Sequence, residues 1–144
     1  MARIKLELPS QFVFSTAISI RITDLNYGAH MGNEVILQIA HEARVQFLAR
    51  MGYTESDSEG RGIIMSDAAI MYRGEAFHGD IIEVQMAVYD FTRKGCDFYY
   101  LMKRKGTDQE IARVKTGIVF FEYASRKTVS VPGRFKEKIE NGLA

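Results

Sequence analysis

The chain has 144 residues, of which 47% are hydrophobic, and its 19 basic and 18 acidic residues leave a formal net charge of +1. This length fits one domain, which we expect to span residues 1–144, and this composition excludes an intrinsically disordered chain. Balanced charge gives no electrostatic reason to bind nucleic acid. The single cysteine excludes an intrachain disulfide, and no apolar run approaches the roughly 18 residues of a membrane span. We therefore expect a cytoplasmic protein that binds neither nucleic acid nor membrane.

The first predicted elements are two segments in which polar and apolar residues alternate. Arg3–Leu8 alternates charged with apolar residues, and Thr16–Thr23 places its isoleucines on one side, so both are predicted to be strands. Asp24–Asn33 follows with two glycines and two asparagines, a composition typical of a loop. Asn33 can cap a helix that runs to about Met51.

One face of this helix is predicted to be buried, because its apolar residues recur at helical spacing: Ile36, Ile39, Ala40, Ala43 and Phe47. Gly52 is a suitable C-terminal stop, and the polar segment Thr54–Gly60 is predicted to be a loop. Four strand-like runs come next: Gly62–Arg73, Asp80–Phe91, Asp97–Lys105 and Glu110–Tyr123. Short glycine-containing connections favour antiparallel pairing of these strands. Arg134–Asn141 is predicted to form a short helix.

One long helix against one antiparallel sheet predicts an α+β fold of two layers. A single helix cannot cover both faces of a sheet of five strands. Self-association is therefore expected on physical grounds alone.

Three stretches carry recognisable motifs: residues 21–33, which contain Asp24-Leu25-Asn26-Tyr27-Gly28-Ala29-His30-Met31-Gly32-Asn33; His41-Glu42-Ala43-Arg44; and Tyr72-Arg73-Gly74-Glu75-Ala76-Phe77-His78-Gly79-Asp80. Their order and spacing resemble the hotdog fold, in the branch that contains 4-hydroxybenzoyl-CoA thioesterase and related acyl-CoA thioesterases. The first stretch is similar to that family's Asp-x-Asp-x-x-Gly-His-x-Asn-Asn pattern. The resemblance covers roughly residues 13–132.

The resemblance implies an antiparallel sheet of about five to six strands wrapped around one long helix. It also implies hydrolysis of acyl-CoA or acyl-carrier thioesters without a cofactor or a metal. The site would lie between the subunits of a homodimer or of a tetramer of dimers. The chain departs from the pattern at Asn26, Ala29 and Gly32. Asn26 stands where the family has its usual catalytic aspartate, and an amide cannot act as a nucleophile or general base.

Thioester hydrolysis requires an activated water, donors for the oxyanion and a positioned substrate. The catalytic candidates are Asp24, Asn26, His30 and Glu42, and the substrate-binding candidates are Tyr27, Met31, Gly32 and Asn33. The oxyanion donors are expected to be backbone N–H groups near the start of the helix.

Each of these residues also has a purely structural interpretation. Asp24 and Asn26 could make turns with the backbone, His30 could bond its own loop, and Glu42 could be a solvated helix residue. The three histidines do not form a metal motif. The basic residues that could contact CoA phosphates are Arg93, Lys94, Lys103, Arg104, Lys105, Arg126 and Lys127. The alternative functions are a non-catalytic module that binds acyl thioesters and, less favoured, a hydratase of the same fold.

Overall fold

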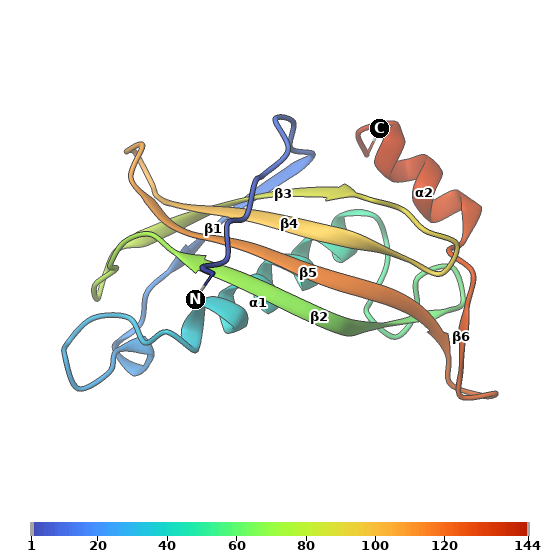
Figure 1. Cartoon of the computed structure of the whole chain (residues 1–144), viewed down its shortest axis with the longest axis horizontal. Helices are drawn as coiled ribbons and strands as arrows, with labels where there is room; N and C mark the ends of the chain where they lie inside the picture. The colour runs from blue at the N-terminus through green and yellow to red at the C-terminus, as the bar shows by residue number, and fades with distance from the viewer. Residues whose placement is uncertain (1, 144) are drawn as a thin grey trace.

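The computed structural model describes residues 2–143, and in that range six strands form one antiparallel sheet that accompanies a long and a short α-helix (Figure 1). The elements are β1 (Phe14–Ser19), the short 3₁₀ helix η1 (Ile22–Asp24), α1 (Val35–Arg50), β2 (Gly62–Tyr72), β3 (Ile81–Tyr89), β4 (Gly95–Arg104), β5 (Glu110–Glu122), β6 (Lys127–Val129) and α2 (Gly133–Glu140). The strand order is β1-β3-β4-β5-β2, and β6 pairs with the end of β5. No helix in this range is long and apolar enough to cross a membrane.

Helix α1 lies along one face of the sheet (Figure 1), and the predicted apolar residues form the buried side. Phe47 is fully buried and meets Phe14 of β1 and Phe98 of β4 edge to face, at centroid distances of 5.4 and 5.7 Å. Such aromatic contacts add stability beyond the apolar area that they bury. The prediction of one long helix packed on an antiparallel sheet is therefore confirmed.

The four predicted strands after the helix are confirmed to within two residues at each end. The predicted short C-terminal helix is also present as α2, where Phe135 packs edge to face on Phe120 of β5. Neither η1 nor β6 was predicted, because three residues are too few to show a period.

The prediction of a strand at Arg3–Leu8 is wrong. This segment pairs with no strand and crosses the face of the sheet opposite α1 (Figure 1). Leu6 and Leu8 are half-buried, and Arg113 of β5 donates a hydrogen bond to the Leu6 carbonyl at 3.2 Å. A chain lying flat on a sheet alternates inward apolar and outward charged residues, so it carries the same pattern as a strand.

Two boundaries near the loop also differ from the prediction. The first strand ends at Ser19 rather than Thr23, and η1 then turns the chain before Asn26. Helix α1 begins at Val35 with Glu34 in the N-cap position, so the prediction that Asn33 caps the helix is wrong. The Asn33 carbonyl instead accepts a hydrogen bond of 2.9 Å from the Tyr72 hydroxyl. At the other end, Gly52 has φ +84°, as a glycine stop requires.

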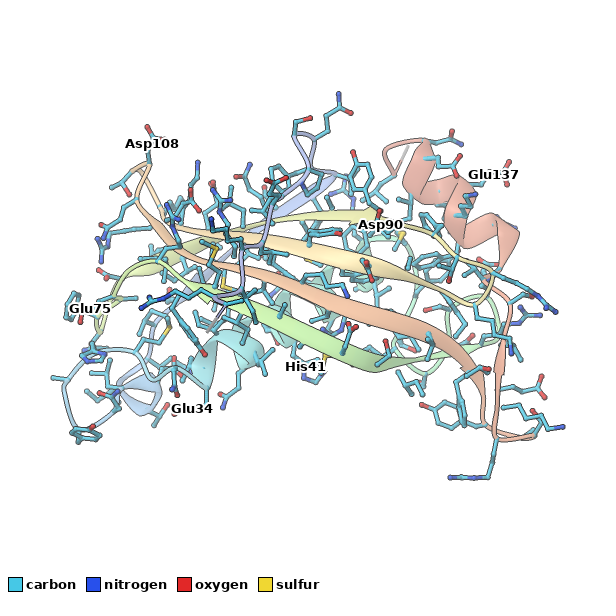
Figure 2. The ribbon with its side chains drawn as sticks, in the orientation of Figure 1. Glu34, His41, Glu75, Asp90, Asp108 and Glu137 are labelled. Atoms are coloured by element: carbon cyan, nitrogen blue, oxygen red, sulfur yellow. The ribbon has the colours of Figure 1, made fainter. Side chains whose placement is uncertain are left out.

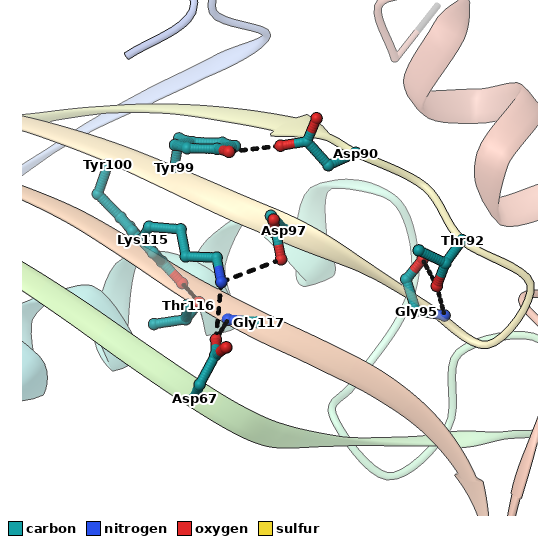
Figure 3. A network of polar contacts seen from close by, with 10 residues as sticks. All are labelled: Asp67, Asp90, Thr92, Gly95, Asp97, Tyr99, Tyr100, Lys115, Thr116 and Gly117. Carbon is teal, nitrogen blue, oxygen red and sulfur yellow. Dashed lines mark hydrogen bonds and ion pairs between the residues drawn. The ribbon is translucent and has the colours of Figure 1, made fainter. Parts of the chain in front are cut away.

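Polar contacts on the face opposite α1 attach the edge strand β2 to the sheet (Figure 3). Lys115 of β5 lies 2.8 Å from Asp67 of β2 and 3.5 Å from Asp97 of β4. The Gly117 N–H also donates to Asp67 at 3.0 Å. The hydrogen bond from Lys115 holds the pKa of Asp67 below its ordinary value despite partial burial.

Candidate functional site

A cavity of about 390 Å³ opens beside the start of α1, and we call it the loop cavity. Its walls come from the loop after η1, the end of β2 and the turn after β2. Six of the predicted site residues line it together: Asn26, Tyr27, His30, Met31, Gly32 and Asn33.

Hydrogen bonds within the loop fix the shape of this cavity. The Asn26 side-chain oxygen accepts the Gly28 N–H at 2.8 Å, and the Asn26 N–H donates to the His30 carbonyl at 2.9 Å. Ala29 has φ 62°, in the left-handed region that favours glycine, at the place where the family pattern has glycine. The Met31 N–H donates to Ala76 at 2.8 Å, which joins the loop to the turn after β2. The turn-making role proposed for Asn26 is therefore present, and it uses only the amide oxygen.

The His30 ring is oriented by its own backbone. Its Nδ1 lies 3.3 Å from the Met31 carbonyl, which can only accept, so Nδ1–H is the donor in this contact. Nε2 lies beside Gly28, 3.0 Å from where a Cβ on that residue would stand, and His30 borders the loop cavity.

Backbone donors are also free at this cavity. Among the residues that the structure describes, the N–H groups of Asn33 and Glu34 have no hydrogen-bond partner. They lie just before the first turn of α1, where the helix dipole favours negative charge. Two adjacent free donors are suited to a carbonyl oxygen on which charge develops.

A second cavity of about 470 Å³, which we call the flank cavity, lies between β1 and α1. It is lined by the other two predicted catalytic residues, Asp24 and Glu42. Because β1 ends early and η1 turns the chain, Asp24 and Asn26 do not project from a strand to the same side, as a continuous strand would require.

The carboxylate of Asp24 is already engaged. It accepts the backbone N–H of Arg21 at 2.8 Å and lies 3.2 Å from the Arg21 guanidinium. Burial favours a raised pKa for Asp24, but the hydrogen bonds and charge of Arg21 outweigh it and hold the pKa below its ordinary value. Glu42 accepts a hydrogen bond from Gln46 at 2.8 Å. Both carboxylates therefore have side-chain partners.

Three polar residues that line the loop cavity were not among the predicted site residues: Glu34, Tyr72 and Glu75. Glu34 lies at the start of α1 and Glu75 on the turn after β2, at the same end of the molecule (Figure 2). An acid in the first turn of a helix is ordinarily explained by the helix dipole. The signal that distinguishes Glu34 is its place directly after the Gly32-Asn33 motif.

A buried polar network lies farther along α1, outside the loop cavity. Arg44 is only 6% exposed, and it donates to Glu55 at 2.9 Å and to the Tyr100 hydroxyl at 3.0 Å. The Tyr100 and Thr116 hydroxyls are 2.9 Å apart, and His41 lies 2.6 Å from Glu55. Burial favours a raised pKa for Glu55, but the hydrogen bonds from Arg44 and His41 hold it below its ordinary value.

The basic residues considered for phosphate binding fall at two ends of the molecule (Figure 1). Lys103, Arg104 and Lys105 lie at the β4–β5 turn, at the end that holds the loop cavity, and the other four lie near β6 and the β3–β4 turn. Arg104 donates to the carbonyl of Glu75 at 2.8 Å, so it supports a wall of the loop cavity. In residues 2–143, no cluster of three His, Cys, Asp or Glu side chains has metal-binding geometry.

The sequence matches the family model described as the thioesterase-like superfamily over residues 20–139. No curated protein sequence matches it significantly. The 1,4-dihydroxy-2-naphthoyl-CoA thioesterase Slr0204 from Synechocystis has a similar structure, with a TM-score of 0.81 at 20% identity over 89% of this chain and 96% of that one. YbaW, a probable thioesterase from Escherichia coli, has a TM-score of 0.76 at 20% identity over 90% and 98%.

A third similar structure is that of SAV2348 from Staphylococcus aureus, which was determined in complex with CoA. Its TM-score is 0.81 at 14% identity, over 96% of this chain and 88% of that one. At these identities the structural matches establish the fold, and they confirm the prediction of a hotdog arrangement.

Proposed function

Because the chain belongs to the thioesterase-like superfamily, we propose that it hydrolyses acyl-CoA thioesters to a free acid and a thiol. The observation that carries this proposal is the loop cavity, which combines two free backbone donors with acceptor and donor side chains. A thioester carbonyl that accepts the N–H groups of Asn33 and Glu34 would be polarised for attack by water.

The side chains of the loop cavity suit the remaining tasks. The amide nitrogen of Asn26 can donate to the thioester, since its oxygen is used within the loop. His30 Nε2 can orient the attacking water. Tyr27, fully exposed, and Met31 are proposed to contact the substrate, whereas the space beside the backbone of Gly32 is taken by the Glu34 carboxylate. A catalytic role for Asp24 and Glu42 from the flank cavity remains a prediction.

We also propose that the working unit is a homodimer or a tetramer of dimers, with the site between subunits. Within residues 2–143, β2 pairs only with β5, so its outer edge is open. Apolar residues are exposed beside that edge, among them Met65 of β2 at 48% and Leu37 of α1 at 36%. A second copy would cover them. Light scattering that shows a monomer at micromolar concentration would contradict this assembly.

The identity of the acyl group is the part of the substrate that must be found by experiment. One structural neighbour acts on an aromatic acyl-CoA and another was crystallised with CoA, which supports a CoA thioester over an acyl-carrier thioester. The test is a panel of short, medium, long and aromatic acyl-CoAs with the purified protein, in which released thiol is followed. We expect thiol release from at least one member of the panel.

The same panel separates the alternatives. A non-catalytic module would bind an acyl-CoA in calorimetry without thiol release, and a hydratase would hydrate an enoyl-CoA. If no substrate of the panel releases thiol, the proposed activity is wrong. Asp24→Asn and Glu42→Gln keep shape and remove charge, so a loss of turnover in either variant would place the flank cavity in the reaction.

A further inference from the structure

We propose that Glu34 is the general base that activates water in this site, in the role for which Asn26 lacks a carboxylate. This inference rests on the proposed thioesterase function. Three features of Glu34 support the inference: the position of its carboxylate, the absence of a hydrogen-bond partner within residues 2–143, and its small role in holding the helix.

The carboxylate of Glu34 lies directly over the backbone of the loop. A methyl group on Gly32 would be 2.5 and 2.7 Å from its two oxygens, closer than a real contact allows. The carboxylate therefore occupies the space that the missing side chain of Gly32 leaves open. It borders the loop cavity together with His30 and Asn33.

The lone pairs of this carboxylate are free. In the described part of the chain, no side chain or backbone group donates to Glu34, whereas Asp24 is held by Arg21 and Glu42 by Gln46. An ionised carboxylate accepts hydrogen bonds at both oxygens, so Glu34 can accept one from a water molecule in the cavity.

Glu34 contributes little to holding the helix. It stands in the N-cap position of α1, but its side chain makes no capping hydrogen bond. A carboxylate at a helix start that neither caps the helix nor forms an ion pair has no structural partner to lose. Its replacement should therefore change activity without unfolding the protein.

The reaction step balances with water as the only co-substrate. Glu34 takes a proton from water as the water oxygen forms a bond to the thioester carbonyl carbon. The oxyanion, held by backbone donors, collapses and the carbon–sulfur bond breaks. The thiolate leaves and receives the proton from Glu34, which restores the carboxylate and yields acid and thiol.

The experiment compares Glu34→Gln with Glu137→Gln on the best substrate of the acyl-CoA panel. Glu137 is exposed on α2, at the opposite end of the molecule from Glu34 (Figure 2), and within residues 2–143 its side chain also has no hydrogen-bond partner, so it is the matched control. We expect Glu34→Gln to lower kcat by about 10²-fold or more, the usual scale of general base catalysis. Glu137→Gln should remain within about threefold of the wild type.

Two further variants distinguish a base from a merely structural acid. Activity of Glu34→Ala should rise with added formate, a small carboxylate that fits the vacated space. Gly32→Ala should displace the Glu34 carboxylate and lower kcat, with an unchanged melting temperature, because a flexible side chain can move aside.

The outcomes separate the two proposals. A wild-type protein that releases no thiol from the panel overturns the proposed function and this inference together. An active wild type with Glu34→Gln within threefold of its turnover, or a folded Glu34→Ala that formate does not rescue, overturns the assignment of Glu34 alone.

Discussion

The segment just before α1 and the second half of α1 treat polar groups in opposite ways. In the second half, Arg44 is buried, and Glu55 and Tyr100 satisfy its hydrogen bonds. Just before the first half, the backbone N–H groups of Asn33 and Glu34, and the Glu34 carboxylate, lack partners in the residues that the structure describes. Both regions are rich in polar atoms, but only one has hydrogen-bonding capacity left for a ligand.

This difference gives a physical criterion for separating structure from chemistry in the molecule. A charge whose bonds are complete stabilises the fold, and its removal leaves other buried groups unpaired. A charge without partners beside a cavity can bind water or substrate. Changes in the first region should therefore alter stability, and changes in the second should alter turnover.

The largest effect is expected from Arg44→Met. The substitution keeps the length of the buried stem but leaves Glu55 and the Tyr100 hydroxyl without their donor. We expect a loss of about 3 kcal/mol in the free energy of unfolding, measured by urea titration, as for one partner removed from a buried ion pair. A loss below about 1 kcal/mol would mean that this buried polar network does not stabilise the fold.

A smaller effect is expected when the carboxylate is moved within the loop cavity. Asn26→Asp introduced into the Glu34→Gln protein restores one carboxylate to the same cavity. We expect kcat to recover at least about tenfold over Glu34→Gln alone, which corresponds to about 1.4 kcal/mol. Asn141→Asp in the same background, which adds a carboxylate at the exposed end of α2 outside this cavity, serves as the control. No recovery in the folded double variant would show that position 26 does not reach the reacting water.

The smallest effect concerns pH. The hydrogen bonds from Arg44 and His41 depress the pKa of Glu55, so its stabilisation is complete above the ordinary value of 4.5 and disappears as pH falls through the depressed value. Glu55→Gln should therefore be less stable than the wild type at pH 7, and the gap should narrow as pH falls below 4.5. We expect the pH-dependent part to stay below about 1 kcal/mol, because Glu55 is partly exposed. A gap that stays constant in urea titrations across this range would contradict the assignment.

The fold was largely predictable because its long elements carry clear periods. Helix α1 and the four later strands each span enough residues to show their apolar face. The alternation of Arg3–Leu8 led to a wrong strand prediction. A strand in a sheet and an unpaired chain that crosses a sheet both bury every second residue, so they share the same pattern. Helix α1 begins one residue later than predicted, and the Tyr72 hydroxyl, 39 positions away, binds the Asn33 carbonyl, a contact that the local sequence could not show.

The sequence was sufficient to predict which loop forms the candidate site. It was not sufficient to predict which side chains of the site are hydrogen-bonded to one another. The motif located six residues of the loop cavity, yet it could not show that η1 turns Asp24 into the neighbouring cavity. It also could not show which carboxylate is already bonded. Arg21, three residues before Asp24, was a local signal for that pairing, whereas nothing near Arg44 in the sequence indicates Tyr100.

The open edge of β2 has a further consequence for the newly made chain. Its eleven residues, Gly62–Tyr72, carry a single charge, Asp67, and are otherwise isoleucine, methionine, alanine and tyrosine with one glycine, one serine and no proline. Such a segment is prone to intermolecular β-aggregation whenever it is uncovered. Asp67 is thus a gatekeeper as well as the ion-pair partner of Lys115. Neutralising it should shorten the lag time of amyloid-dye fluorescence at a given protein concentration, because the strand would lose its only electrostatic barrier to stacking.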